Sequence, residues 1–152
     1  MYQNPYTQYF ADNAMLYTVI SVIWYVLLAA GLWKTFTKAG VAGWKAIIPV
    51  YNFYLLFKIA WQPRMFWLWL CLSVLGVVLA VYAMNAMMVY IALALNIVSS
   101  VMLAVLWYNV SLAYGHGLGY FLGLYFLNPI FIMILGFGSS RFVGNRYETA
   151  LN

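Results

Sequence analysis

The chain has 152 residues, of which 68% are hydrophobic, 20% are aromatic and 6% are charged, and its net charge is +5. Soluble domains carry about 25% charged residues, so this composition excludes a water-soluble globular protein and indicates an integral membrane protein. Basic loops beside membrane spans normally set orientation, so the positive charge does not predict nucleic-acid binding. Five of the seven basic residues flank one loop: Lys34, Lys38, Lys45, Lys58 and Arg64.

The chain opens with a polar arm, residues 1–13, that contains no lysine or arginine. A cleaved signal peptide begins with a basic region, so we expect the first apolar block to be retained. This block, about residues 14–33, is long enough to span a membrane, and Trp33 stands where an interfacial anchor would.

The stretch "WKAIIPVYNFYLLFK", Trp44–Lys58, is apolar but too short to span. A twelve-residue helix covers about 18 Å, whereas the hydrocarbon core is about 30 Å thick. We expect an amphipathic helix over about residues 46–60 that starts near Pro49 and lies in the membrane interface, with a shallow re-entrant loop as the alternative. Asn52 falls toward the apolar side and needs a polar partner. The candidate motif and interfacial residues are Trp44, Lys45, Pro49, Tyr51, Asn52, Tyr54 and Lys58.

Residues 65–107 form an apolar run that is too long for one span. One helix of that length would measure about 65 Å, so the run has to fold as a helical hairpin. We place the turn near Tyr82–Asn85, because Asn85 is the strongly polar residue close to the midpoint. The two expected spans are then about residues 65–83 and 86–107.

A last apolar block, about residues 118–137, contains Asn128–Pro129. Four full spans are the preferred arrangement, but they place the polar tail, residues 139–152, outside with two arginines, against the positive-inside rule. In the alternative the block dips in and returns as a re-entrant hairpin, which leaves the tail inside and requires protein or water around its backbone. The expected fold is an all-α membrane domain, residues 14–138, with four transmembrane helices and a short amphipathic interfacial or re-entrant helix between the first and second.

Small residues recur on two of these segments at helical spacing. Glycine every four residues lets another backbone approach closely, either within the chain or from a second copy. On the second span, the small residues Ser73, Gly76 and Ala80 follow one another at spacings of three and four, which indicates the same kind of close packing. The candidate helix-packing residues are Ser73, Gly76, Ala80, Gly115, Gly119 and Gly123.

The third span carries a polar stripe of Asn96, Ser99 and Ser100. Polar groups in hydrocarbon need partners, so the stripe faces either another helix or a hydrated path. The spans contain no Asp, Glu, Lys or Arg, which argues against a proton relay or an ion-coupled transporter.

Residues for chemistry are sparse. Asp12 and Glu148 are the two carboxylates, at opposite ends of the chain, His116 is the one histidine and Cys71 the one cysteine. No carboxylate pair, metal cluster or Ser–His–Asp set can be assembled from them. We therefore expect no catalytic residue, no metal site and no cofactor, and we expect Cys71 to be a small buried hydrophobe.

Two motifs resemble a known family. "GWKAIIPVYNFYLLFKIA", residues 43–60, and "LNPIFIMILGFGSSRF", residues 127–142, are similar to motifs of small bacterial multi-pass membrane proteins classed as a domain of unknown function. Some relatives are labelled signal-peptidase-like. Such enzymes use a Ser–Lys dyad and an extramembrane β-rich domain, and this chain has room for neither. The resemblance implies a bacterial plasma (inner) membrane location and no particular activity.

The sequence thus favours a non-catalytic scaffold or accessory subunit that acts through helix packing in a larger or homo-oligomeric assembly. The alternative is a channel or transporter for a small neutral or lipid-like solute. The expected partners are membrane lipids, with anionic head groups among them, and other membrane subunits or further copies. The positive-inside rule places the N-terminus outside and residues 34–64 in the cytoplasm.

Overall fold

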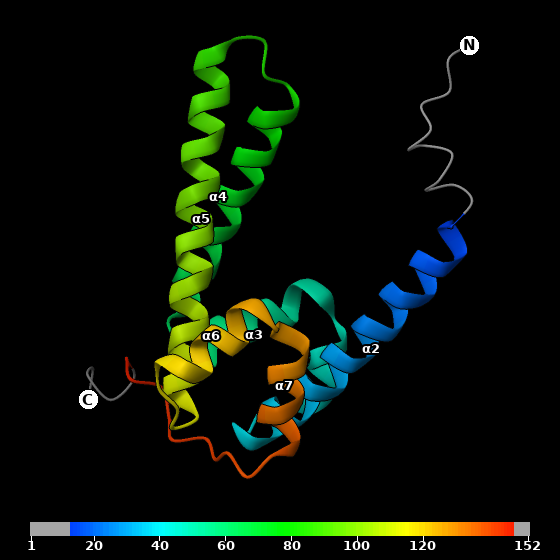
Figure 1. Ribbon diagram of the computed structural model, residues 1–152. Coiled ribbons are helices and arrows are strands. Elements are labelled where there is room, and N and C mark those ends of the chain that lie inside the picture. The colour runs from blue at the N-terminus through cyan, green and yellow to red at the C-terminus, as the bar shows by residue number, and fades with distance from the viewer. Residues whose placement is uncertain (1–12, 148–152) are drawn as a thin grey trace.

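The computed structural model describes residues 13–147, and the regular structure in this range is entirely helical (Figure 1). This confirms the predicted all-α class. The elements, in chain order, are α2 (Ala14–Lys38), the 3-10 helix η1 (Gly43–Ile47), α3 (Pro49–Ala60), α4 (Pro63–Val81), α5 (Ala86–Ala113), α6 (Leu118–Phe126) and α7 (Asn128–Phe137).

Three helices, α2, α4 and α5, are long and apolar enough to cross a membrane. They correspond to the first three predicted spans. α2 and α5 continue past the expected ends to Lys38 and Ala113, whereas α4 ends at Val81, before the expected residue 83. The turn between α4 and α5 lies where Asn85 predicts it. The Asn85 side chain caps α5 by accepting a hydrogen bond from the backbone N–H of Met88 at 2.9 Å, which satisfies one of the unpaired amides at the start of the helix.

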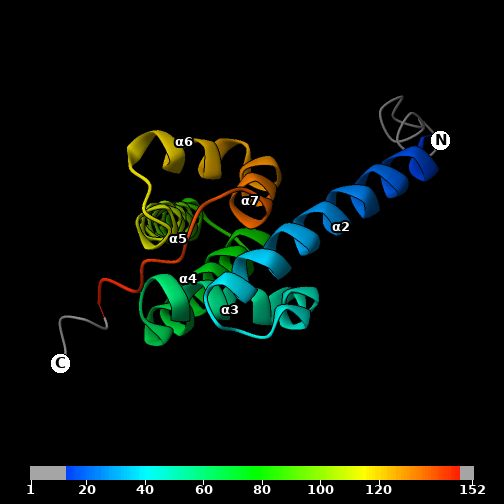
Figure 2. The same cartoon turned by 90° about the horizontal axis from the view of Figure 1, so that it is seen from below.

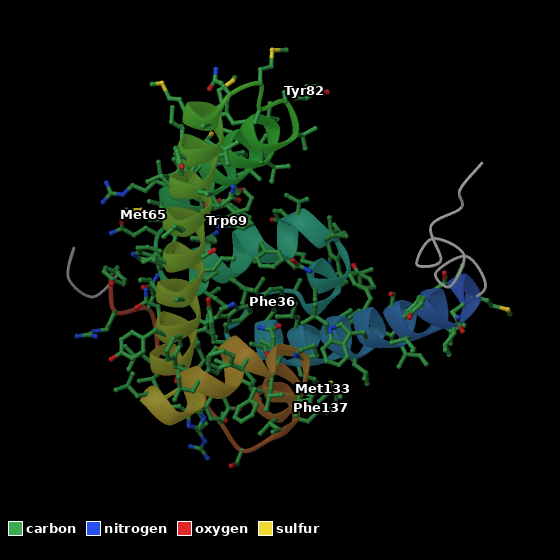
Figure 3. All side chains as sticks on the ribbon, turned by 45° about the horizontal axis from the view of Figure 1, so that its top comes forward. Phe36, Met65, Trp69, Tyr82, Met133 and Phe137 are labelled. Carbon is green, nitrogen blue, oxygen red and sulfur yellow. The ribbon has the colours of Figure 1, made fainter. Side chains whose placement is uncertain are left out.

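The three long helices come together at one end, the base of the molecule, where α3, α6 and α7 also lie. In Figure 1 the α4–α5 hairpin stands upright, α2 leans away from it, and α3, α6 and α7 lie at the lower end. The α4–α5 turn is at the opposite, upper end, and the start of α2 lies away from the base but well below this turn. Figure 2 shows the lower end of α2 between α7 on one side and η1 with α3 on the other. Figure 3 places Tyr82 at the hairpin turn, far from Met133 and Phe137 of α7.

The expected fourth span is not a continuous helix. It is divided at Leu127 into α6, with nine residues, and α7, with ten. Helices of these lengths measure about 14–15 Å, half of what a span needs. Pro129 lacks an N–H and stands in the first turn of α7, and the Asn128 side chain donates to the carbonyl of Leu124 at 2.9 Å across the break. The structure thus has three long helices and a short helical pair, and the expected number of four spans is not confirmed.

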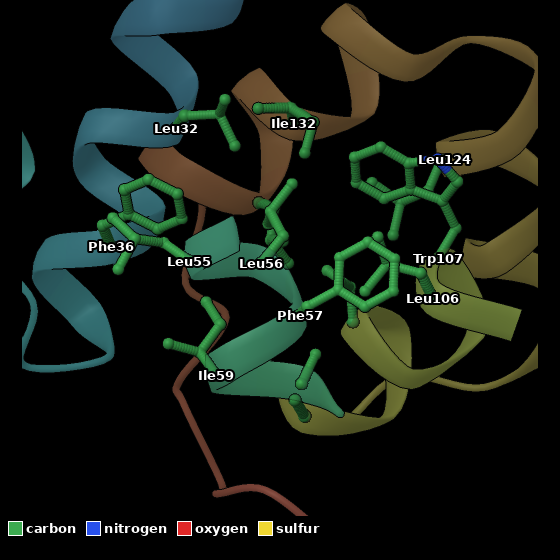
Figure 4. Packing of buried hydrophobic residues seen from close by; sticks show 14 of the residues in the cluster. Leu32, Phe36, Leu55, Leu56, Phe57, Ile59, Leu106, Trp107, Leu124 and Ile132 are labelled. Carbon is green, nitrogen blue, oxygen red and sulfur yellow. The ribbon is translucent and has the colours of Figure 1, made fainter. Parts of the chain in front are cut away.

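The core surrounds α3. Leu55, Leu56 and Phe57 are at most 3% exposed, and they contact side chains from α2, α5, α6 and α7 (Figure 4). The expected helix over residues 46–60 forms as η1 and α3, but its apolar face is covered by protein rather than by lipid. Hydrophobic periodicity identifies the apolar side of a helix and does not identify what covers it. The position of this helix at the membrane interface stays a prediction.

Candidate functional site

A groove on the side of the membrane domain collects two residues of the predicted polar stripe. It has a volume of about 310 Å³. Asn96 stands eleven residues into the 28-residue helix α5, so the groove lies well within the span. Its lining comes from α5 and α6 and consists of Leu93, Asn96, Ile97, Ser100, Val101, Ala104 and Tyr125.

The side-chain amide of Asn96 is only partly paired. Its Nδ2 donates to the carbonyl of Ala92 at 2.8 Å. The hydroxyl of Ser100 donates to the Asn96 carbonyl at 2.8 Å. Among the residues that the structure describes, none donates a hydrogen bond to Asn96 Oδ1. Asn96, whose amide is half-paired, thus lines a mainly apolar groove together with Ser100 and Tyr125.

Ser99, the third residue of the stripe, does not face this groove. It is 5% exposed, and its hydroxyl has no hydrogen-bond partner. Consecutive residues on an α-helix point about 100° apart, so Ser99 and Ser100 face different neighbours. The structure thus brings together Asn96 and Ser100 but not all three.

On α4, the small residues have unequal surroundings. Gly76 is buried against α5, and a Cβ there would stand 2.8 Å from Asn96 Nδ2 and 3.3 Å from Leu95 Cβ. Ser73 is half-buried and donates to the carbonyl of its own-helix residue Trp69 at 2.8 Å. Ala80 is exposed. Gly76 is therefore the position at which the α4–α5 contact requires a small residue.

The glycines at positions 115, 119 and 123 do not form one strip. The helix begins at Leu118, and Gly115 lies in the preceding turn with φ +77°, a left-handed conformation that favours glycine. A Cβ on Gly119 would meet nothing within 4 Å, whereas one on Gly123 would collide with the ring of Phe131. Only Gly123 of the three supports a tight contact, and the contact is with α7 of the same chain.

A closer backbone contact joins Gly31 of α2 to Gly136 of α7. A Cβ on Gly136 would be 2.5 Å from the Gly31 carbonyl oxygen, and one on Gly31 would be 2.8 Å from Ile132 Cγ2. Sequence reasoning missed this pair. Each glycine stands in a different apolar segment, far apart along the chain, so no four-residue repeat signals them.

Lys38 ties the end of α7 to the end of α2. Its ammonium donates to the carbonyls of Leu135 at 2.6 Å and Gly138 at 2.8 Å. These carbonyls belong to the last turn and the C-cap of α7, where helices leave carbonyls unpaired and favour positive charge. Lys38, one of the basic residues predicted to set the orientation, thus also holds the C-terminal end of α7 against α2.

The tail returns to the same end of the molecule. The Val143 N–H donates to the Ala113 carbonyl at 2.7 Å. Asn145 Nδ2 donates to the carbonyls of Lys58 at 3.1 Å and Trp61 at 2.6 Å. Arg141 and Arg146 flank these anchors, so all seven basic residues lie at the lower end of the three long helices.

Tyr114 adds a buried link between α5 and α2. Its hydroxyl donates to the Thr35 carbonyl at 2.7 Å. Burial raises the pKa of the Tyr114 hydroxyl well above its usual value of 10.0, because the charged form loses its hydration. The hydroxyl is therefore protonated, and able to donate, throughout the physiological pH range.

The predicted motif around α3 surrounds one buried amide. Asn52 is 3% exposed, and its Nδ2 donates to the Ala46 carbonyl at 3.1 Å, while its Oδ1 has no partner. Pro49 begins α3, as its fixed φ favours. Lys58 is exposed at the other end of α3, away from the aromatic residues near Pro49. The expected polar partner of Asn52 is thus the backbone of η1, and this hydrogen bond holds η1 against α3.

The aromatic members of the motif lie on one surface. Tyr51 and Tyr54 stack with ring centroids 5.7 Å apart, and Tyr54 meets Phe66 of α4 edge to face at 5.5 Å. Lys45 Nζ stands 6.0 Å from the Trp44 ring and 5.9 Å from the Tyr51 ring. These cation–π contacts hold the ammonium at the aromatic surface.

Within residues 13–147 no three His, Cys, Asp or Glu side chains come together as a metal site. Asp12 and Glu148 lie outside the described residues. His116 Nε2 is 2.7 Å from the Ser140 hydroxyl, and its ring stacks on Tyr120 at 4.1 Å. Cys71 is exposed on α4, not buried as expected. The expectations of no catalytic residue and no cofactor stay predictions.

The fold and composition define a helical, membrane-spanning protein. The chain belongs to a family of unknown function (DUF5684), which matches residues 44–90 and 86–145. The two matched stretches include the α3 motif and the Asn128–Pro129 break. No curated protein and no solved structure matches the chain.

Proposed function

We propose that the chain is a non-catalytic membrane scaffold or accessory subunit that works by self-association within the bilayer. Asn96 carries the proposal, because it lines the groove between α5 and α6 and its amide oxygen accepts no hydrogen bond from the described residues. An unpaired polar group in hydrocarbon costs several kcal/mol. A hydrogen bond between helices stabilises their association by about 1–2 kcal/mol in model peptides. Pairing this amide therefore favours association of helices at the groove.

The partner that fits best is a second copy of the chain. An asparagine side chain carries both a donor and an acceptor, so two Asn96 amides across a two-fold axis complement each other. Ser100 stands one turn further along the same groove, and Ala104 is small enough for close approach. No residue that lines the groove is ionisable except Tyr125, so the two copies bring no like charges together there.

The orientation that we propose has three spans, with α6 and α7 as a re-entrant pair. The N-terminus is outside, and residues 34–64 and the tail are in the cytoplasm of a bacterial cell. The support is that all seven basic residues lie at one end, whereas the α4–α5 turn at the other end has none. This arrangement also removes the conflict with the positive-inside rule that four full spans created.

A transport path receives no comparable support. Asn96 and Ser100 line a groove on the outer side of a single chain, and Ser99 is buried elsewhere. A solute path along these residues would have to form between copies, so it would itself depend on association at the groove.

The test is the mass of the protein in mild detergent, measured by light scattering after purification. We expect the wild type to contain more than one copy, and Asn96→Leu and Ile97→Trp to shift it to a monomer. Val19→Trp is the matched control, since Val19 is exposed on α2 as Ile97 is on α5. Unchanged helix content by circular dichroism shows that each variant is folded. A monomeric wild type, or Ile97→Trp behaving like Val19→Trp, would refute the proposal.

A further inference from the structure

An apolar groove with an aromatic rim lies at the junction of η1, α3 and α4, apart from the association groove. Its volume is about 460 Å³, within the range of about 300–1,000 Å³ that is typical of small-molecule sites. Val50 is 61% exposed and Trp67 is 59% exposed, whereas Phe66 is buried beneath them. The lining consists of Ile48, Val50, Tyr51, Tyr54, Phe66 and Trp67.

A second, smaller apolar groove adjoins the first. It has a volume of about 250 Å³ and shares Val50 and Phe66 with the first groove. Pro49 and Phe53 of α3 and Trp69 of α4 complete much of its wall. The exposed Val50 side chain thus separates two neighbouring apolar channels. Two such channels side by side suit a ligand with two hydrocarbon chains.

A cation stands at the edge of the first groove. Lys45 Nζ lies 5.9 Å from the ring centroid of Tyr51, which lines this groove, and 6.0 Å from that of Trp44. The part of the chain that the structure describes contains no carboxylate, so no side chain there neutralises the ammonium. The ligand that complements the edge of the groove is therefore an anion.

The groove also lies at the end of a long apolar helix, α4, where exposed tryptophans gather. Trp67 is in the first turns of α4, and Trp44 is 53% exposed on η1. Exposed tryptophans at the end of a span are typical of the membrane–water interface. A second copy of the chain would bring like charge to Lys45, because the chain has five more basic than acidic residues. An anion with apolar chains fits both the charge and this position.

We propose that these two grooves hold the acyl chains of one anionic phospholipid, with its phosphate against Lys45. Tyr51 and Trp44 position the lysine, and Val50 separates the two chains. The site requires only that this end of the protein lies at a membrane surface, and it is independent of association at Asn96. A lipid bound here covers the aromatic surface of the α3 motif and joins η1 to α4.

The experiment measures quenching of tryptophan fluorescence in the full-length protein in detergent. The probes are phosphatidylglycerol and phosphatidylcholine that carry the same brominated acyl chains. One basic residue near an anionic surface contributes about a fivefold preference. We expect the wild type to favour phosphatidylglycerol by about that factor, and Trp67→Phe to lose part of the quenching.

Two variants separate the charge from the groove. We expect Lys45→Gln to abolish the preference for phosphatidylglycerol, and Lys58→Gln, at the far end of α3, to retain it. Val50→Phe fills the groove at an exposed position without adding a tryptophan, so it should weaken quenching by both lipids without loss of helix content. Glycerol phosphate, a soluble headgroup analogue, should not displace the lipid. Equal losses in the two lysine variants, no effect of Val50→Phe, or displacement by glycerol phosphate would each overturn the proposal.

Discussion

Replacing Gly136 by alanine tests how closely α7 must approach α2. The added Cβ would stand 2.5 Å from the Gly31 carbonyl oxygen, whereas carbon–oxygen contacts between helices settle at about 3.3–3.6 Å. The helices therefore have to separate by about 1 Å, because the atom in the way is backbone and cannot rotate aside. Overpacking of this kind costs about 1–3 kcal/mol.

Further losses accompany this separation. A gap of about 0.5–1 Å removes a quarter to a half of the dispersion attraction between packed atoms, and Leu32 and Ile132 are fully packed at this crossing. The hydrogen bonds from Lys38 to Leu135 and Gly138, on either side of Gly136, are lengthened as well. We expect Gly136→Ala to lower the free energy of unfolding by about 2–3 kcal/mol.

The assay is reversible unfolding of the purified protein in mixed detergent, followed by circular dichroism at increasing sodium dodecyl sulfate. Gly119→Ala is the matched control, because a Cβ there meets nothing within 4 Å and the residue is in a helix. The control should be stabilised by up to about 1 kcal/mol, since alanine is the better helix former. The reasoning fails if Gly136→Ala is as stable as wild type, or if both variants lose the same amount.

Three further predictions concern the residues at the lower end of the long helices and the orientation of the chain. Lys38→Met should lower the free energy of unfolding by about 1.5–3 kcal/mol, in the same detergent assay, while Lys58→Met changes it little. The free energy of unfolding should fall as the pH rises above about 10, because the buried Tyr114 stays protonated while tyrosine in the unfolded chain ionises. Tyr114→Phe should reduce this dependence of the unfolding free energy on pH. Tyr90→Phe, at an exposed site, should leave the dependence unchanged. A compartment-sensitive reporter at the C-terminus should report the cytoplasm, and a periplasmic signal would contradict the three-span orientation.

Helix positions were the most predictable feature, because they depend on local chemistry. The apolar run over residues 65–107 is too long for one helix, and Asn85 is suited to cap the second one. Pro49 begins α3 because a first-turn proline loses no hydrogen bond. Each of these signals is read from a few neighbouring residues, so no tertiary contact was needed.

The division of the last apolar block could not be decided in this way. Proline within a span is tolerated when neighbouring groups satisfy the freed backbone, so Asn128–Pro129 is compatible with a kinked span and with a re-entrant pair. The course of α7 follows instead from long-range contacts, Gly136 against Gly31 and Lys38 on Leu135. These residues are about 100 positions apart, and no local pattern links them.

Burial was equally hard to predict. The apolar faces of α3 and of α5 look alike in sequence, yet Phe57 is fully buried in protein and Ile97 is 63% exposed. In a membrane protein lipid and protein cover apolar side chains equally well, so hydropathy does not separate the two. Asn96 and Ser99 show the same limit, since both were expected on one stripe and they face different surroundings.

The central claim, self-association at the Asn96 groove, is tested most directly by disulfide crosslinking in native membranes. In a Cys71→Ala background, a single cysteine is introduced at Ile97 beside the groove or at Val19 on the outer face of α2. Self-association predicts a crosslinked dimer on oxidation of Ile97→Cys and none for Val19→Cys. Absence of a dimer at Ile97→Cys, or dimers formed equally at both positions, would contradict it.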